Sequence, residues 1–414
     1  MSHFSTAILK LPNFRFLLGA RMFGVMATQA QAVIVGWQVY SLTGSTWMLG
    51  LTGLVEAVPA ILCALYAGHI VDVSHPKKIF ALCLGALLLN TLMLLVFAGG
   101  YIEVGNNAVV AIIFTGIFIS GLARSFIMPS AFSLLPLIVG RKDIPSASSW
   151  QTACFQVSTI GGPTIAGVIY GFGGVHRAWL FPFLMICLSC LCALMIFVPY
   201  ELQDKASRPA AGKNIKEGWA FLLQNRSLLS IMALDMLAVL FGGAVAILPA
   251  FADQVLGLGP EALGLLRAAP AAGAILTALY FALLPMKRIT AVRMLIVVGG
   301  FGVSMICFGL STSFWAAFLF LALSGAFDSI SMVIRGTLMQ LLTPDKMRGR
   351  VSSVNSMFII SSNEIGAFES GAAASLLGLV PSIVIGGIGT LVVVSLTAVF
   401  SKDFRRLSVD TQDD

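Results

Sequence analysis

The sequence predicts an all-α membrane protein in which twelve transmembrane helices form two pseudo-symmetric six-helix bundles. Two observations predict this fold: the chain is apolar almost throughout, and it contains an internal repeat. Of the 414 residues, 58% are hydrophobic and only 10% are charged, and the mean hydropathy is +0.95. A water-soluble domain carries about 25% charged residues. This chain therefore has too few polar residues to cover a soluble surface.

The repeat relates the first half of the chain to the second. Residues 49–66 match residues 263–280 at an offset of 214, and residues 121–174 match residues 325–378 at an offset of 204. A shorter third loop in the second half accounts for the change of offset. The second match preserves these pairs: Gly121/Gly325, Ser125/Ser329, Lys142/Lys346, Ser148/Ser352, Gly162/Gly366 and Gly167/Gly371. Duplicated halves of this size are typical of transporters that alternate access to a central site.

About twelve segments are long enough to cross a hydrocarbon layer, which needs roughly 20 residues per helix. The predicted spans are 14–42, 46–73, 78–100, 107–138, 144–172, 175–199, 227–256, 261–285, 290–310, 313–343, 350–378 and 380–400. Glycine and proline inside them are compatible with helices, because neighbouring helices satisfy the backbone groups that these residues free. The predicted domains are an N-terminal bundle over 1–200, a linker over 201–226, a C-terminal bundle over 227–400 and a tail over 401–414.

Lysine and arginine alternate between loops in a way that predicts orientation. They gather at both ends of the chain and in every second loop, as at Lys77, Lys78, Arg141 and Lys142. Because positively charged loops stay in the cytoplasm, both termini are predicted to be cytoplasmic. No cleavable signal peptide is expected before the first span. The net charge of +7 thus follows from topology, and no nucleic-acid partner is predicted.

The residues that would support catalysis or cofactor binding are scarce. The seven cysteines fall in predicted spans, where we expect them to pack rather than to form disulfides or bind metal. The four histidines lie at ends or in loops, and neither a His-Glu-x-x-His motif, a nucleophile elbow nor a Walker loop occurs. Scattered single charges also do not form the ring of identical ligands that a channel needs. The sequence predicts no enzyme, no metal and no cofactor.

Ionisable residues near the middle of the spans are the candidate functional residues. Each costs about 2.5–3.5 kcal/mol at a helix centre, so each is predicted to face a cavity or a partner. A buried structural pair is the alternative for any of them. The candidates for cavity charge or proton coupling are Arg21, Glu56, Arg124, Asp235, Arg267, Asp328, Arg335, Glu364 and Glu369.

The repeat places opposite charges at matching positions of the two halves. The offset of 214 sets Arg21 opposite Asp235, and the offset of 204 sets Arg124 opposite Asp328. We hypothesise that these residues line one cavity, to which the first half contributes cations and the second half anions. Burial favours a protonated carboxylate and a nearby arginine favours an ionised one, so relative movement of the two can load and release a proton. Glu56, Asp235 and Asp328 are the candidate proton carriers.

Helix geometry constrains the remaining acidic residues. Asp328 and Arg335 are seven residues apart, which places them on one helical face about 10.5 Å from each other. Glu364 and Glu369 are five residues apart and diverge by about 140° around their helix. At most one of these glutamates is therefore predicted to face the cavity centre, and the choice stays open.

Two motifs carry a resemblance to a known family. The loop from Gly68 through Asp72 to Lys77 and Lys78 resembles the signature loop of the major facilitator superfamily, with His75 and Pro76 as departures. The resemblance implies a latch on the cytoplasmic side. Its second-half copy has Ala282 and Met286 at the key positions. Gly162, Pro163 and Gly167 resemble the glycine-proline motif of the antiporters, with Ala166 in place of a glycine. A kinked, closely packed helix is the alternative for this second motif.

Further segments narrow the resemblance to one branch. Residues 13–16, 37–45 and 343–351 are similar to bacterial drug and siderophore exporters of the enterobactin-exporter type. In such antiporters the fourth span often holds a coupling arginine, the place of Arg124, although the glutamine-glycine that usually follows is missing. The resemblance implies a monomeric proton-coupled exporter of a small amphipathic molecule, working in the lipid bilayer. An importer or a lysophospholipid flippase of the same fold is the alternative.

Overall fold

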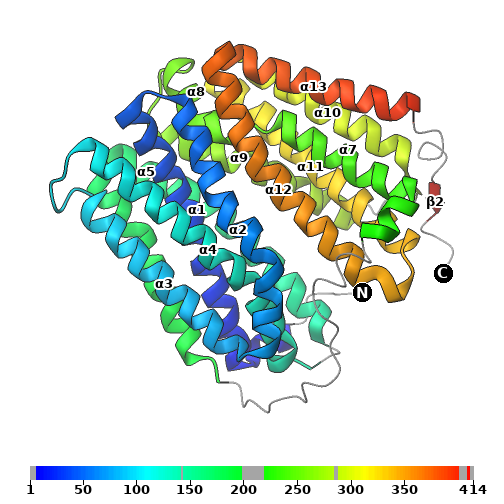
Figure 1. Ribbon diagram of the computed structural model, residues 1–414, viewed down its shortest axis with the longest axis horizontal. Helices are drawn as coiled ribbons and strands as arrows, with labels where there is room; N and C mark the ends of the chain where they lie inside the picture. Colours follow the sequence, from blue (N-terminus) through cyan, green and yellow to red (C-terminus); the bar gives the residue numbers. More distant parts are fainter. Residues whose placement is uncertain (1–5, 141–142, 198–218, 284–287, 401–407, 411–414) are drawn as a thin grey trace. The chain divides into compact units, whose positions relative to one another are not determined.

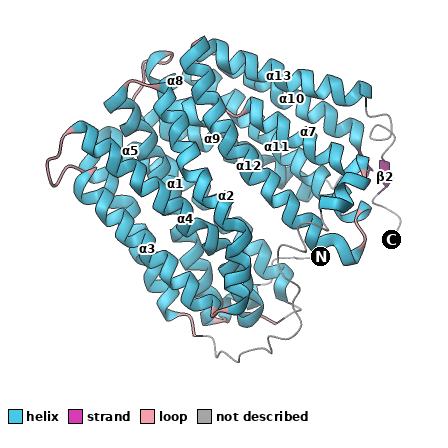
Figure 2. Cartoon of the chain, in the orientation of Figure 1, coloured by secondary structure: helices cyan, strands magenta, loops and turns pink. Residues whose placement is uncertain are grey.

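The computed structural model describes residues 6–140, 143–197, 219–283, 288–400 and 408–410. These residues are almost entirely helical (Figure 1, Figure 2). Nine of the described helices are long and apolar enough to cross a membrane. One of them, over residues 146–195, has 50 residues and covers two predicted spans. The predicted all-helical membrane fold is confirmed in this respect, and the number of twelve spans stays a prediction.

The chain divides into two compact units. Unit 1 comprises residues 1–44, 55–211 and 259–265, and unit 2 comprises residues 45–54, 212–258 and 266–414. The elements of unit 1 are η1 (Thr6–Lys10), α1 (Pro12–Thr43), most of α2 (Thr46–Val73), α3 (Pro76–Phe97), α4 (Asn106–Ile138) and α5 (Ile144–Met195). Those of unit 2 are α7 (Arg226–Gly242), η4 (Val245–Ile247), α8 (Leu248–Gln254), most of α9 (Pro260–Leu283), β1 (Arg288–Thr290), α10 (Ala291–Gly309), α11 (Phe314–Leu342), α12 (Asp345–Leu377), α13 (Leu379–Phe400) and β2 (Ser408–Asp410).

In unit 1, α1 packs along α5, while α3 packs on α4 and α5 (Figure 1). Its core contains the fully buried side chains of Phe14, Leu17 and Phe80. Serine hydroxyls of α5 also bind the backbone of α1: Ser158 Oγ donates to the Met22 carbonyl at 2.9 Å, and Ser189 Oγ donates to the Ala20 carbonyl at 2.7 Å. Such hydrogen bonds hold helices together where lipid supplies no hydrophobic driving force.

The buried side chain of Gln38 on α1 makes hydrogen bonds with two other segments of unit 1. Gln38 Nε2 on α1 donates to the carbonyl of Ala98, just after α3, at 2.6 Å. Trp179 Nε1 on α5 donates to Gln38 Oε1 at 2.9 Å. Trp179 lies beyond Gly174, where α5 is interrupted by a backbone with φ 73° and ψ 178°. Glycine adopts such a conformation without the penalty that a Cβ imposes. The interruption falls between the predicted spans 144–172 and 175–199.

In unit 2, α10 packs on α11 and α13, and α7 packs on α12 and α13. The span predicted as one helix over 227–256 is interrupted, because α7 ends at Gly242 and η4 and α8 follow it. The broken segment is held from two sides: Ser370 Oγ of α12 donates to the Gly243 carbonyl, and Thr390 Oγ1 of α13 donates to the Ala238 carbonyl at 3.2 Å. These hydroxyls compensate part of the hydrogen bonding that the break removes.

The internal repeat is visible in the helix crossings. A Cβ added at Gly162 of α5 would lie 2.8 Å from the carbonyl oxygen of Met26 on α1, and one added at Gly366 of α12 would lie 3.0 Å from that of Leu240 on α7. Met26 and Leu240 are 214 residues apart, and the two glycines are 204 apart, as in the sequence matches. The same close crossing therefore occurs once in each unit.

One feature falls outside the predicted all-helical fold. β1 and β2 pair antiparallel, with Arg288 opposite Asp410 and Thr290 opposite Ser408. The following helix, α10, begins with a side-chain cap, because Thr290 Oγ1 accepts a hydrogen bond from the backbone N–H of Arg293 at 3.2 Å. The end of the chain is thus attached to the segment that precedes α10.

Candidate functional site in the membrane-spanning helices

The principal buried ion pair joins α7 to α11. Arg335 Nη1 donates to Asp235 Oδ2, and Ser331 Oγ donates to Asp235 Oδ1 at 3.2 Å. The side chains of Asp235 and Arg335 are only 7% and 6% exposed, respectively. Ser331 and Arg335 are four residues apart on α11, so one helical face supplies both donors. The arrangement compensates the cost of removing both charges from water.

Asp328 adds a second negative charge to this pair. It lies seven residues before Arg335 on α11, and its charge interacts with those of both Asp235 and Arg335. No described residue donates a hydrogen bond to its carboxylate. With both aspartates ionised, Asp235, Asp328 and Arg335 carry a net charge of −1, so a single bound proton makes this acidic cluster neutral. Removal of net charge from an apolar interior is favourable.

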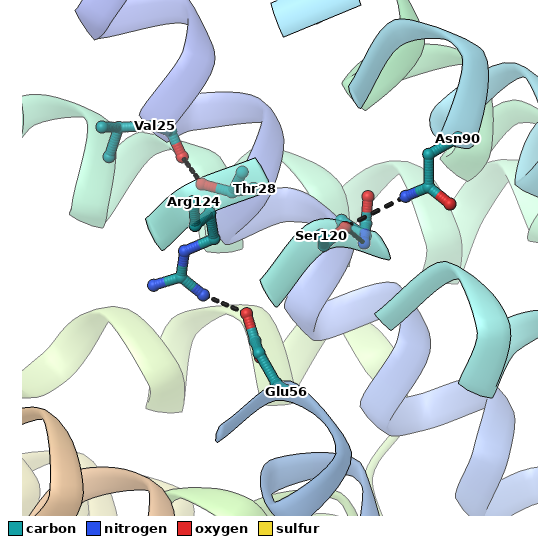
Figure 3. A network of polar contacts seen from close by, with 7 residues as sticks. Val25, Thr28, Glu56, Asn90, Ser120 and Arg124 are labelled. Carbon is teal, nitrogen blue, oxygen red and sulfur yellow. Dashed lines mark hydrogen bonds and ion pairs between the residues drawn. The ribbon is translucent and has the colours of Figure 1, made fainter. Parts of the chain in front are cut away.

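In unit 1, the predicted residues Glu56 and Arg124 form an ion pair. Arg124 Nη1 of α4 donates to Glu56 Oε1 of α2, as Figure 3 shows. The side chain of Arg124 is 48% exposed and that of Glu56 is 26% exposed. This pair is therefore much more accessible than the acidic cluster of unit 2.

A neutral network lies close to this ion pair in unit 1. Ser120 Oγ of α4 accepts from Asn90 Nδ2 of α3 at 3.0 Å (Figure 3). It also accepts from Gln31 Nε2 of α1 at 3.0 Å. All three residues are buried. Ser120 lies one helical turn before Arg124 on α4, so the network links the position of the charged side chain to two further helices.

Arg21 of α1 has neutral partners. Its Nη1 donates to Gln151 Oε1 of α5, and its Nη2 contacts the sulfur of Met128 on α4 at 3.8 Å. The repeat placed Arg21 and Asp235 at matching positions, but their surroundings differ. Asp235 meets an opposite charge within unit 2, whereas Arg21 meets an amide and a thioether in unit 1.

The other candidate residues occupy separate places. Arg267 on α9 and Glu364 and Glu369 on α12 are half-buried. Glu369 directly precedes Ser370, which binds the broken segment after α7. In the predicted latch, Lys77 and Lys78 lie in the first turn of α3, and Lys78 is exposed. Gly68 and Asp72 belong to α2, but the surroundings of these two residues lie outside what the structure describes.

The glycine-proline motif makes close helix contacts within unit 1. Gly162 lies against the backbone of α1, as described above. A Cβ at Gly167 would lie 2.7 Å from the Cα of Gly264 on α9. Pro163 lies inside α5 and is buried. These contacts leave no room for larger side chains at the two glycine positions.

Several polar residues of the site were not among the sequence candidates. They are the neutral side chains Gln31, Asn90, Ser120, Gln151 and Ser331, which bind one another or the predicted charges. Their only signal in the sequence is an amide or hydroxyl inside an apolar span. Among the described residues, no group of three or more His, Cys, Asp or Glu side chains could hold a metal ion.

Comparison with known proteins agrees with this architecture. Residues 4–410 match the family described as transmembrane secretion effector. The enterobactin exporter EntS of Shigella boydii serotype 4 (strain Sb227) is 24% identical over 402 residues, which cover 95% of this chain and 93% of the exporter. EntS of Escherichia coli O1:K1 / APEC shows the same identity and coverage.

Solved transporter structures share the fold. A bacterial homologue of the iron transporter ferroportin, in an inward-facing state, aligns with a TM-score of 0.73 and 16% identity, covering 95% of this chain and 99% of that one. The nucleoside transporter NupG aligns with a TM-score of 0.68 and 14% identity, covering 94% of this chain and 99% of that one. The predicted resemblance is confirmed: this chain is a multi-pass membrane transporter and belongs to the transmembrane secretion effector family of the major facilitator superfamily.

Proposed function

We propose that the protein exports a small amphipathic molecule, a drug or a siderophore, across the bacterial inner membrane in exchange for protons. The transporter works as a monomer with both termini in the cytoplasm, and it alternates access of its binding site between the two sides of the membrane. The similarity to enterobactin exporters over 95% of the chain supports a siderophore-like cargo and the outward direction.

The observation that carries proton coupling is the acidic cluster of Asp235, Asp328 and Arg335. Asp235 pairs with Arg335 in the interior of unit 2, and Asp328 lies near enough for its charge to interact with those of both residues. When one carboxylate takes up a proton, the negative charge of the other still balances Arg335, so the cluster passes between a charged and a neutral state. Burial penalises the charged state, which links proton binding to any movement that changes access of water to α7 and α11.

A transport assay in inside-out membrane vesicles tests this proposal. Respiration acidifies the vesicle interior, and enterobactin uptake into the vesicles then reports export. We expect accumulation in the wild type that an uncoupler abolishes. Asp235→Asn and Asp328→Asn should each lower gradient-driven accumulation at least tenfold, while exchange of labelled for unlabelled enterobactin without a gradient continues. Asp253→Asn, at an exposed position of α8, is the matched control.

The same vesicles separate the alternatives. Normal gradient-driven transport by both neutral variants would show that the acidic cluster carries no proton. Accumulation in right-side-out vesicles instead would identify an importer. Translocation of a fluorescent lysophospholipid, with no enterobactin transport, would identify a lysophospholipid flippase.

A further inference from the structure

Arg21 is a cation in unit 1 with no carboxylate partner among the described residues. Its two contacts, Gln151 Oε1 and Met128 Sδ, are both neutral. The helices that contain Arg21, Met128 and Gln151 have no acidic residue, and Glu56 of α2 pairs with Arg124. An unbalanced guanidinium within a membrane-spanning helix is energetically unfavourable.

The hydrogen-bonding capacity of Arg21 is mostly unused. A guanidinium has more N–H donors than these two contacts engage, and a thioether sulfur is a weak acceptor. Gln151 adds further donors, because its Nε2 atom is shielded from solvent and has no hydrogen-bond partner among the described residues. The orientation of this amide is determined by Arg21, since the reversed amide would place N–H groups against the guanidinium. The pair therefore presents positive charge and N–H donors, while its one carbonyl oxygen is already engaged.

Hydrogen-bond donors that lack acceptors, next to a positive charge, favour the binding of an anion. An oxygen anion next to the guanidinium accepts hydrogen bonds from Arg21, and an oxygen of the same group also accepts from Gln151 Nε2 on the neighbouring helix. Charge-assisted hydrogen bonds of this kind are roughly twice as strong as neutral ones. The anion also supplies the missing counter-charge, and it displaces only a weak competitor, the Met128 sulfur.

We propose that Arg21 and Gln151 bind the carboxylate or phenolate group of the transported molecule. This inference rests on the proposed function and specifies its cargo as an amphipathic anion. In this site Arg21 supplies the charge, and Gln151 orients the anion between α1 and α5.

Salicylate and salicylamide form a matched pair of probes, because they differ mainly in the charge of one group. Each is titrated into the purified full-length protein in a neutral detergent, and the unfolding temperature is followed. We expect a saturable increase with salicylate and none with salicylamide, since a ligand that binds the folded state stabilises it. Arg21→Gln should weaken the apparent salicylate affinity at least tenfold, and Gln151→Met severalfold. Arg177→Gln, at an exposed position of α5, should leave it unchanged.

Two results would overturn the site. One is equal stabilisation by both probes, and the other is salicylate binding that persists in folded Arg21→Gln. If Arg21→Gln does not fold, Gln151→Met and Arg21→Lys test the same point, because the lysine retains the charge and loses the planar fork. Displacement of salicylate by phosphatidylglycerol in nanodiscs, dependent on Arg21, would assign the site to a lipid headgroup instead. The measurement uses no gradient, so failure of proton coupling in the vesicle assay leaves its result intact.

Discussion

Gly121 of α4 lies directly against the backbone carbonyl of Glu56 on α2, so the residue that pairs with Arg124 also lies at a close crossing of the two helices. A side chain at position 121 would force the helices apart and displace the ion pair. We expect Gly121→Leu to destabilise the protein by about 1–3 kcal/mol, the usual cost of overpacking. Thermal unfolding in detergent measures the loss. Gly85→Leu on α3 is the control, because no atom lies within 4 Å of an added Cβ there.

The positive charge of Arg335 offsets the negative charges of Asp235 and Asp328, so its removal should destabilise the protein. We expect Arg335→Leu to destabilise the protein by about 3–5 kcal/mol, because it leaves buried negative charge without a partner. Adding Asp235→Asn to Arg335→Leu removes one of the unbalanced charges and should recover part of the loss. Denaturation of the wild type, the two single variants and the double variant gives the free energies of unfolding for a double-mutant cycle. Additive losses would show that the pair is not energetically coupled.

Gln38 satisfies the indole N–H of Trp179 and the carbonyl of Ala98 at the same time. Gln38→Leu leaves both groups buried without that partner, for which we expect a loss of about 1–3 kcal/mol per orphaned group. A shifted tryptophan emission should accompany the lower unfolding temperature. Gln29→Leu serves for comparison, since the Gln29 amide makes no hydrogen bond with any described residue. Equal effects of the two substitutions would argue against the bridge.

Substitution of glycine by alanine should have opposite effects on stability at Gly174 and at Gly336. Gly174→Ala places a Cβ on a backbone with φ 73°, which costs on the order of 1–3 kcal/mol even though no atom lies within 4 Å. Gly336 is inside α11, also with open space around an added Cβ, so Gly336→Ala should stabilise the helix by roughly 0.5–1 kcal/mol. Unfolding temperatures that move in the same direction would contradict this account of the interruption in α5.

Most helix boundaries could be predicted because apolar length is a strong local signal. The predicted span 107–138, for example, corresponds to α4, Asn106–Ile138. The repeat was equally informative, since the paired glycines Gly162 and Gly366 make the same crossing in both units. The interruption after α7 escaped prediction: the 214 offset aligns Gly243 with Gln29, which lies inside the unbroken α1.

The partners of the candidate charges depend on packing that the sequence does not reveal. Helical periodicity placed Asp328 and Arg335 on one face, but only the packing of α7 on α11 brings Asp235 to Arg335. Gln151 and Ser331 carried no distinctive signal, because amides and hydroxyls occur at many positions of these spans. Their roles follow from the side chain that each one meets.

The short pairing of β1 with β2 has a practical consequence for handling the protein. Because Ser408–Asp410 is bound by its backbone to Arg288–Thr290, an affinity tag or fluorescent reporter fused to the last residue is tethered next to a paired strand. A chain shortened before Ser408 leaves the backbone groups of β1 unpaired, and such an edge is a template for pairing with other chains. We would then attribute aggregation of the truncated protein to this exposed strand edge. A tag is better fused to the full-length chain through a flexible linker.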